Sequence, residues 1–270
     1  MKRRFINRRW IDYGLVVSAV SYLNTWPLVW GFLHGPQRGL FDFRFDLPVH
    51  CAEALRDRKA DIGLVPCAEL DRLGLDFLPE LGIACDGPVR SILLISRRPI
   101  DGIRTLAVDS SSRTSVALAR IILGERYGCR PRVTPHSPFL DEMLLENDAA
   151  LIIGDPALHI DPEALPYRTL DLGAEWVAWS GLPMVFAVWA GRKEFLTADV
   201  AAAFCDSHGW GAGHVEDMVE RASAERGFRR DLARDYFTRH IVYTLTSKHL
   251  EGLALFRKLV LALDPIPAGV

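Results

Sequence analysis

The chain has 270 residues, of which 49% are hydrophobic, 24% charged and 10% aromatic, a composition that excludes disordered, collagenous and coiled-coil proteins. With 32 Lys and Arg against 34 Asp and Glu the formal net charge is −2, and no long basic stripe extends beyond residues 2–9, which argues against nucleic acid as a partner. This length allows one large domain or two lobes.

Short apolar runs alternate with helical patterns along most of the chain, as is typical of an α/β protein with largely parallel sheets. The first run, residues 14–20, predicts a strand, and Pro27 follows at a position suited to the first turn of a helix. Residues 41–47 alternate apolar and charged side chains, which predicts a strand with one solvated face. Further strands are predicted at 61–65, 91–96, 105–108, 149–153 and 184–190, and helices at 49–59, 67–73 and 113–127.

From residue 193 onward the pattern is wholly helical, with helices predicted at 200–204, 215–223, 231–243 and 250–263. We expect two lobes: residues 1–96 plus 186–270 form lobe 1, which contains the C-terminal helices, and residues 97–185 form lobe 2. Two of the predicted strands would carry the chain between the lobes. Such crossings create a hinge, so we expect a ligand cleft between the lobes.

The N-terminal region superficially resembles a signal peptide, because a basic start precedes the apolar stretches 15–20 and 28–33. Ser21, Asn24 and Pro27 interrupt these stretches and no small-residue cleavage site follows. No window has the 18 apolar residues that a membrane span needs. The cysteines are far apart and form no C-x-x-C pair, which favours a reducing cytoplasm. They are Cys51, Cys67, Cys85, Cys129 and Cys205.

Hydroxyl groups gather where the helix predicted at 113–127 begins. Three serines precede it at 110–112, so hydroxyls, backbone N–H groups and a guanidinium meet at a helix N-terminus, an arrangement suited to an anion. A single serine would suffice as a helix cap, so we expect anion binding here. The candidate contacts are Ser112, Arg113, Thr114 and Ser115. Alternatively, the Arg113 side chain faces away from the anion and pairs with Asp109 or Glu142.

Other polar residues lie at the ends of predicted strands. Ser21, Tyr22 and Asn24 follow the first strand, at the edge where open α/β sheets bind ligands. Asn24 both donates and accepts hydrogen bonds, although an Asx-type turn explains it equally well. Arg90 and Ser91 either meet a ligand or end a strand in solvent.

Gly154 and Asp155 close the strand at 149–153. The Asp155 carboxylate contacts a ligand, accepts a lobe-closing hydrogen bond or caps a helix, and we favour the cap.

The eight histidines show no metal-ligand spacing and are interpreted as surface or structural residues. The sequence contains no G-x-S-x-G elbow, no P-loop and no G-x-G-x-x-G motif. It therefore lacks the motifs that usually indicate a hydrolase, a nucleotide-binding protein or a dinucleotide-binding protein. The residues predict a cleft for a small anion, in either a binding protein or a cofactor-free enzyme.

Six segments, in order, resemble the chorismate dehydratases of the futalosine route to menaquinone (MqnA), within the MqnA/MqnD family. They are VSAVSYLNTWPLVWGF (17–32), DIGLVPCAEL (61–70), GPVRSILLISRRP (87–99), TLAVDSSSRTSVALARIIL (105–123), AALIIGDPAL (149–158) and DLGAEWVAWSGLPMVFAVWA (171–190). The combination of SYLN-x-x-PL, SSRTS and IGDPAL is specific, whereas the helical tail is not diagnostic. Cys67 stands where the family often has serine, so we expect no polar role there.

The resemblance implies a two-lobed, type II periplasmic-binding-protein-like fold with a helical C-terminal segment, kept in the cytoplasm. It implies a hydro-lyase that converts chorismate to 3-[(1-carboxyvinyl)oxy]benzoate and water without metal, organic cofactor, membrane or obligatory protein partner. Asn24 and Ser91 would be catalytic, holding the enolpyruvyl carboxylate of chorismate while it takes the ring proton. The implied substrate-binding residues are Ser21, Ser112, Arg113, Thr114, Ser115, Gly154 and Asp155. A 1,4-dihydroxy-6-naphthoate synthase-like enzyme and a non-catalytic binding protein remain alternatives.

Overall fold

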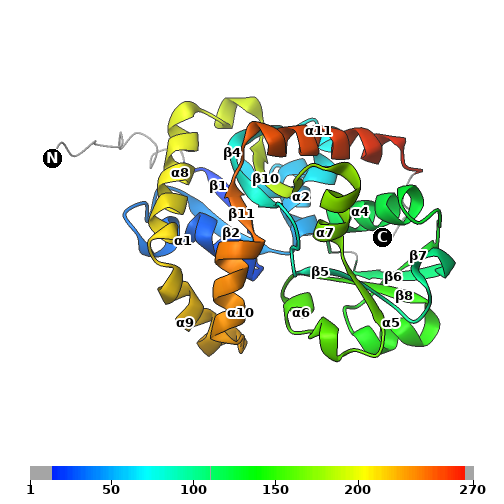
Figure 1. Ribbon diagram of the computed structural model, residues 1–270. Helices are drawn as coiled ribbons and strands as arrows, with labels where there is room; N and C mark the ends of the chain where they lie inside the picture. Colours follow the sequence, from blue (N-terminus) through cyan, green and yellow to red (C-terminus); the bar gives the residue numbers. More distant parts are fainter. Residues whose placement is uncertain (1–13, 110, 265–270) are drawn as a thin grey trace.

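The computed structural model describes residues 14–109 and 111–264, so the basic residues at 2–9 and Ser110 lie outside the described part. It consists of two β-sheets surrounded by helices (Figure 1), which confirms the predicted α/β class. The six-stranded sheet, in the order β11-β4-β10-β3-β1-β2, contains β1 (Val16–Val20), β2 (Asp42–Asp46), β3 (Ile62–Pro66), β4 (Asp76–Cys85), β10 (Met184–Gly191) and β11 (Val242–Thr244). The five-stranded sheet, in the order β7-β6-β8-β5-β9, contains β5 (Ile92–Ser96), β6 (Thr105–Asp109), β7 (Arg132–His136), β8 (Ala149–Ile153) and β9 (Arg168–Asp171).

Helices connect the strands and make up most of the C-terminal segment. They are α1 (Trp26–His34), α2 (Pro48–Arg56), α3 (Leu70–Leu73), α4 (Arg113–Glu125), α5 (Leu140–Glu146), α6 (Gly154–Leu158), α7 (Leu172–Ser180), α8 (Ala198–Ala212), α9 (Val215–Arg226), α10 (Arg230–Asp235) and α11 (Ser247–Ala262). Shorter 3₁₀ turns include η2 (Leu23–Thr25) and η3 (Cys67–Glu69). In the described residues, no helix has both the length and the apolar character needed to cross a bilayer.

The expectation of largely parallel sheets is wrong, because both sheets are mixed. β1 pairs in parallel with β2 and β3, and β6 with β7 and β8. However, β10 runs antiparallel to β3 and β4, and β5 runs antiparallel to β8 and β9. The chain passes from the six-stranded to the five-stranded sheet at β5 and returns at β10. Each of these two strands is antiparallel to both of its neighbours.

The expectation of a wholly helical tail is also wrong. Residues 242–244 form β11, which pairs antiparallel with β4 through Val242 opposite Ala84 and Thr244 opposite Leu81. The segment carries β-branched and aromatic side chains, and the edge of β4 offers it unpaired backbone groups. Tertiary pairing therefore overrides the local helical pattern.

The apolar stretches near the N-terminus are core elements of this fold. Residues 16–20 form β1 and residues 26–34 form α1, with Pro27 in its first turn. Val17 and Leu28 are fully buried. β2 is the edge strand beyond β1 and leaves most of its side chains exposed.

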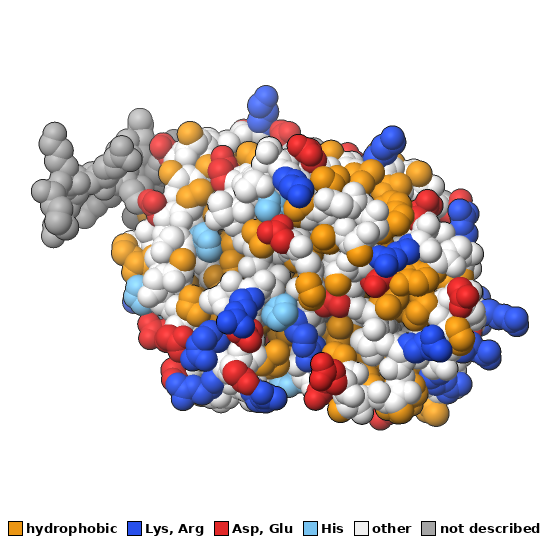
Figure 2. Space-filling view, viewed as in Figure 1, with side chains coloured by type: hydrophobic (Ala, Val, Ile, Leu, Met, Phe, Trp, Pro, Cys, Tyr) orange, Lys and Arg blue, Asp and Glu red, His pale blue; other side chains and the backbone are white. Residues whose placement is uncertain are grey.

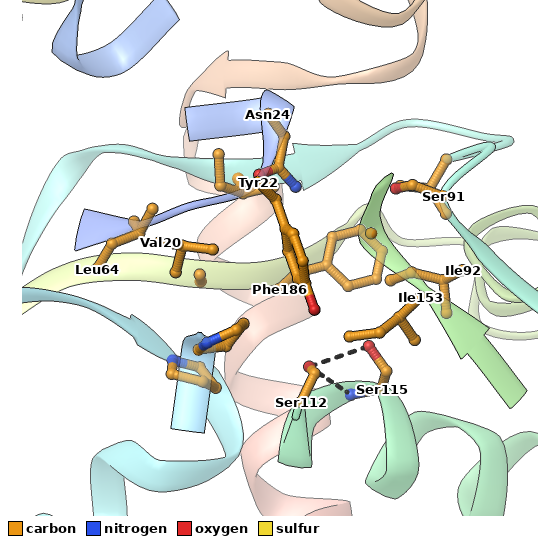
Figure 3. Close-up of a pocket in the computed structure, with 16 residues that line it drawn as sticks. Val20, Tyr22, Asn24, Leu64, Ser91, Ile92, Ser112, Ser115, Ile153 and Phe186 are labelled. Atoms are coloured by element: carbon orange, nitrogen blue, oxygen red, sulfur yellow. Dashed lines mark hydrogen bonds between the residues drawn. The ribbon is translucent and has the colours of Figure 1, made fainter. Parts of the chain in front are cut away.

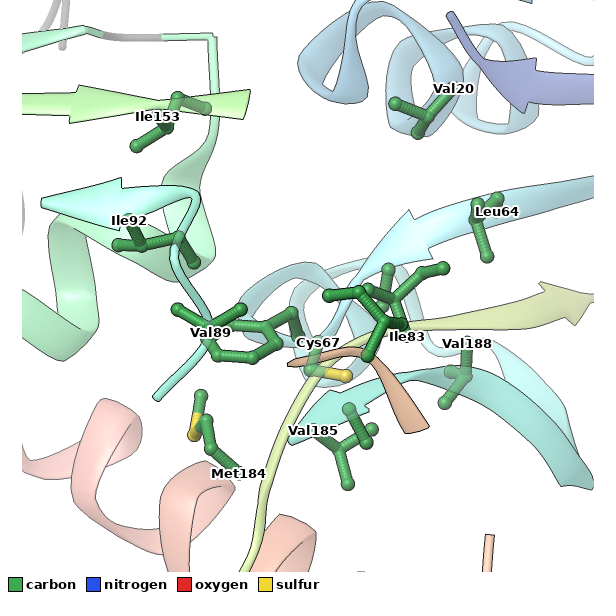
Figure 4. Packing of buried hydrophobic residues seen from close by; sticks show 14 of the residues in the cluster. Val20, Leu64, Cys67, Ile83, Val89, Ile92, Ile153, Met184, Val185 and Val188 are labelled. Carbon is green, nitrogen blue, oxygen red and sulfur yellow. The ribbon is translucent and has the colours of Figure 1, made fainter. Parts of the chain in front are cut away.

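The larger of two apolar clusters in the described residues extends from one sheet to the other (Figure 4). Val20 and Leu64 of the six-stranded sheet face the same buried region as Ile92 and Ile153 of the five-stranded sheet. Cys67 lies in this core with no exposed surface, and burial raises the pKa of its thiol well above the usual range. Cys67 is therefore a packing residue here, in line with the prediction of no polar role.

We propose that each sheet forms the centre of one lobe. The chain leaves the six-stranded sheet after β4 and returns to it at β10. Because β5 belongs to the five-stranded sheet, the first crossing in this proposal lies at residues 86–91 rather than within the strand.

Charges of both signs are interspersed on the surface. Figure 2 shows blue and red side chains adjacent over the region of α9 and α10, where Arg230 pairs with Glu220 and Arg234 with Glu216. The region of α9 and α10 therefore offers no continuous basic patch that would hold a polyanion.

Candidate active site

A cavity lies between the two sheets, and its walls are mostly apolar (Figure 3). Apolar walls with a few polar groups are typical of small-molecule sites. The polar side chains that line it are those of Tyr22, Asn24, Ser91, Ser112 and Ser115, and Gly154 also contributes. In Figure 3, Asn24 and Ser91 lie on one side, Ser112 and Ser115 on the opposite side, and the Tyr22 ring between them.

Asn24 reaches the cavity because β1 ends at Val20 and the chain turns into η2. Its Oδ1 atom is buried and has no hydrogen-bond partner in the described part of the chain. A buried amide oxygen without a partner is costly, so a donor supplied by a ligand would satisfy it.

Ser91 lies immediately before β5 and is 2% exposed. Its Oγ accepts a hydrogen bond of 2.8 Å from the hydroxyl of Tyr236. Tyr236 lies within the helix predicted at 231–243 but outside the six segments that carry the family resemblance, and no local pattern marks it as a site residue. The two residues are 145 positions apart, so only the fold brings them together.

Ser112 and Ser115 lie where α4 begins. Ser112 is the N-cap, with its Oγ 3.4 Å from the backbone N of Ser115 and 3.1 Å from the Ser115 Oγ. Both side chains also line the cavity. The capping and ligand-binding interpretations of Ser112 are therefore compatible, and the positive end of the helix dipole faces the cavity.

Arg113 and Thr114 do not line the cavity. The Thr114 Oγ1 accepts a 3.1 Å hydrogen bond from the backbone N of Ala68, and Arg113 pairs with Glu69, with 3.1 Å between Nη1 and Oε1. The predicted alternative partners of Arg113, Asp109 and Glu142, are not used. These contacts fix α4 to η3, because η3 presents a backbone donor and a buried carboxylate to the helix.

Asp155 does not line the cavity either, and it links α6 to η2 and α9. Its Oδ1 accepts a 2.9 Å hydrogen bond from the backbone N of Leu23, and its Oδ2 pairs with Arg226. Arg226 in turn donates to the backbone oxygen of Ser21 at 2.9 Å. The favoured cap is wrong, because α6 has no side-chain cap hydrogen bond, and Asp155 instead accepts hydrogen bonds from distant segments of the chain. Ser21 takes part through its backbone.

Tyr22 crosses the cavity and bonds to the segment between β6 and α4, with its hydroxyl 3.0 Å from the Ser111 Oγ. Gly154 has a positive φ of +63°, and a Cβ there would lie 2.7 Å from the Tyr22 ring. Only glycine therefore allows this close approach. Burial raises the pKa of Tyr22 to about 12, so it is a neutral hydrogen-bonding group at physiological pH.

Arg90 neither contacts the cavity nor ends the strand in solvent. Its backbone N donates to Asp171 at 2.6 Å, and its guanidinium donates to the backbone oxygen of Ala157 at 3.1 Å and to that of Ile160. It thus ties the crossing before β5 to the end of α6. Within the described residues, no group of three His, Cys, Asp or Glu side chains is placed to hold a metal.

A family model described as "Menaquinone biosynthesis" matches residues 15–261. The chorismate dehydratase of Thermus thermophilus is 31% identical over 182 residues, covering 62% of this chain and 66% of that enzyme. The chorismate dehydratase of Campylobacter jejuni is 28% identical over 177 residues, covering 66% of this chain and 63% of that enzyme. The matches therefore span slightly less than two thirds of both relatives.

Solved structures show the same fold at low identity. A protein of Archaeoglobus fulgidus has a TM-score of 0.73 at 16% identity, covering 92% of this chain and 97% of its own. The periplasmic aliphatic sulphonate-binding protein of Escherichia coli has a TM-score of 0.60 at 12% identity, covering 92% and 85%. These likenesses confirm the predicted periplasmic-binding-protein-like fold.

Proposed function

The chain belongs to the menaquinone biosynthesis family, and on that premise we propose that it is a chorismate dehydratase. The reaction converts chorismate to 3-[(1-carboxyvinyl)oxy]benzoate and water, which makes the protein a carbon–oxygen lyase. One observation carries the proposal: the cavity between the sheets has polar groups on two opposite sides and apolar walls between them. Chorismate likewise has two carboxylates, one on the ring and one on the enolpyruvyl arm.

The ring carboxylate would bind at the start of α4. Ser112 and Ser115 offer hydroxyl donors there, and the helix dipole favours a negative charge. When the hydrogen on the ether-bearing ring carbon is removed, the electron pair delocalises through the ring alkene onto this carboxylate. Donors aimed at the developing charge would stabilise the transition state.

The enolpyruvyl carboxylate would lie at the opposite side, beside Asn24 and Ser91. It takes the ring proton, and the bond between the adjacent ring carbon and its hydroxyl then breaks, with the bonding electron pair leaving on the hydroxyl oxygen. The hydroxyl departs as water after it receives the proton from the enolpyruvyl carboxyl group. The ring becomes aromatic, which drives the reaction. In this mechanism Asn24 and Ser91 hold the arm over the ring hydrogen and do not titrate.

A non-catalytic anion-binding protein is a second candidate, because the fold neighbours include a sulphonate-binding protein. A 1,4-dihydroxy-6-naphthoate synthase-like activity is a third. Incubating the purified protein with chorismate and following the reaction by proton NMR separates them. Catalytic formation of the aromatic enol ether supports the dehydratase, whereas binding without turnover, or no interaction with chorismate, rejects it.

We place the enzyme in the cytoplasm. All five cysteines lie in the described part of the chain and are unpaired, which suits a reducing compartment.

Affinity for 3-[(1-carboxyvinyl)oxy]benzoate should fall about ten- to a hundredfold in Ser115→Ala, because a hydrogen bond to a charged carboxylate is lost. Thr114→Val is the matched comparison at the same helix end. Its hydroxyl is engaged by Ala68, so affinity should fall less. Isothermal titration calorimetry measures both, and a larger loss in Thr114→Val than in Ser115→Ala would reject this assignment.

A further inference from the structure

Tyr236 is the buried residue that contacts the proposed catalytic groups from behind the cavity wall. It is 1% exposed and begins a π-helical turn, residues Tyr236–His240, that continues α10. Single π-helical turns are uncommon and occur frequently at functional sites. Here the turn is directly followed by the segment that leads into β11.

The hydrogen bond between Tyr236 and Ser91 has a defined direction. The phenol donates to the Ser91 Oγ at 2.8 Å, and both side chains are buried. Because Ser91 already accepts from Tyr236, its own hydroxyl proton is left to donate elsewhere. Ser91 also lines the cavity, so that proton can point toward a ligand.

Asn24 belongs to the same group of side chains. It lies close enough to the Tyr236 hydroxyl to lower its pKa, although burial, the larger effect, raises that pKa well above the usual range. Tyr236 therefore stays protonated at physiological pH and is a permanent donor. On this side of the cavity the Asn24 Oδ1 has no hydrogen-bond partner among the described residues, and the Ser91 proton is free to donate because Ser91 accepts from Tyr236.

We propose that Tyr236 is a positioning residue that holds the Ser91 hydroxyl as a donor toward the enolpyruvyl carboxylate. The inference rests on the proposed function. Tyr236 acts through Ser91 and does not touch the reacting atoms. A fixed donor on this side of the cavity would select a substrate arm that carries a carboxylate, and the free Asn24 Oδ1 would accept a hydrogen bond from that carboxyl group once it has taken the ring proton.

Tyr236→Phe tests the proposal, since it removes the hydroxyl and keeps the ring. We expect kcat for chorismate to fall about tenfold and KM to change much less, because the lost contact orients the transition state. Tyr243→Phe is the matched control: the Tyr243 hydroxyl is buried without a hydrogen-bond partner in the described residues. Its removal should leave kcat unchanged, and thermal unfolding of both variants checks that they fold.

The double variant Tyr236→Phe/Ser91→Ala separates positioning from general packing. If Tyr236 acts through Ser91, adding Tyr236→Phe to Ser91→Ala should cause little further loss of kcat. Equal kcat in Tyr236→Phe and Tyr243→Phe, or losses that multiply in the double variant, would overturn the inference while leaving the dehydratase intact. No turnover by the wild type would overturn both.

Discussion

Replacing Asn24 or Ser91 with alanine should lower kcat for chorismate dehydration about 100-fold and change KM far less. Both side chains line the same side of the cavity. In the proposed mechanism they fix the enolpyruvyl carboxylate over the ring hydrogen, so their loss mainly affects the transition state. Steady-state kinetics of the two variants measures this, and unchanged kcat in both would reject the positioning role.

The pH profile of kcat checks the same mechanism independently. If the base belongs to chorismate, the wild-type profile should contain no ionisation of an essential enzyme group. Asp109 provides the most stringent control, because it is buried at the end of β6 and burial raises its pKa. An ionisation that disappears in Asp109→Asn would replace substrate assistance with an ordinary general base.

Arg226→Ala should destabilise the protein by about 2 kcal/mol, which corresponds to a loss of about 5 °C in Tm for a chain of this size. Burial raises the pKa of Asp155, while the Leu23 N–H and Arg226 act in the opposite direction. Without Arg226 the Asp155 carboxylate stays partly buried and loses its cation. In the proposed division the contact also joins the lobes, so KM for chorismate should rise.

Arg229→Ala is the control for Arg226. Arg229 lies three residues further along and its side chain is 79% exposed, where it pairs with Asp231. Exposed ion pairs contribute little to stability, because water and salt screen them, so the Tm of this variant should barely change. Differential scanning calorimetry compares the two variants, and equal Tm values would show that the Asp155–Arg226 contact does not stabilise the fold.

Local sequence patterns predicted the strands whose apolar, β-branched runs are uninterrupted, including β1, β3 and β8. They missed β4, which contains Pro79 and Gly82 and pairs with β10 through register shifts. They also missed the sheet edges β7 and β9, which are short and partly exposed. Proline, bulges and exposure remove the alternation on which strand prediction depends.

The candidate site was predictable where a residue lies at either end of a strand or opens a helix. Asn24, Ser91, Ser112, Ser115 and Gly154 all line the cavity. The orientations of Arg113, Thr114 and Asp155 were not predictable, because their partners lie in distant segments of the chain. Tyr236 and Arg226 were missed for the same reason: each meets its partner only through the tertiary fold.

A crystal structure with 3-[(1-carboxyvinyl)oxy]benzoate bound tests the central claim most directly, namely that chorismate is dehydrated in the cavity between the sheets. We predict that the product lies in that cavity, with its benzoate carboxylate at Ser112 and Ser115 and its enolpyruvyl carboxylate at Ser91 and Asn24. Product bound outside the cavity, or with neither carboxylate at these side chains, would contradict the account.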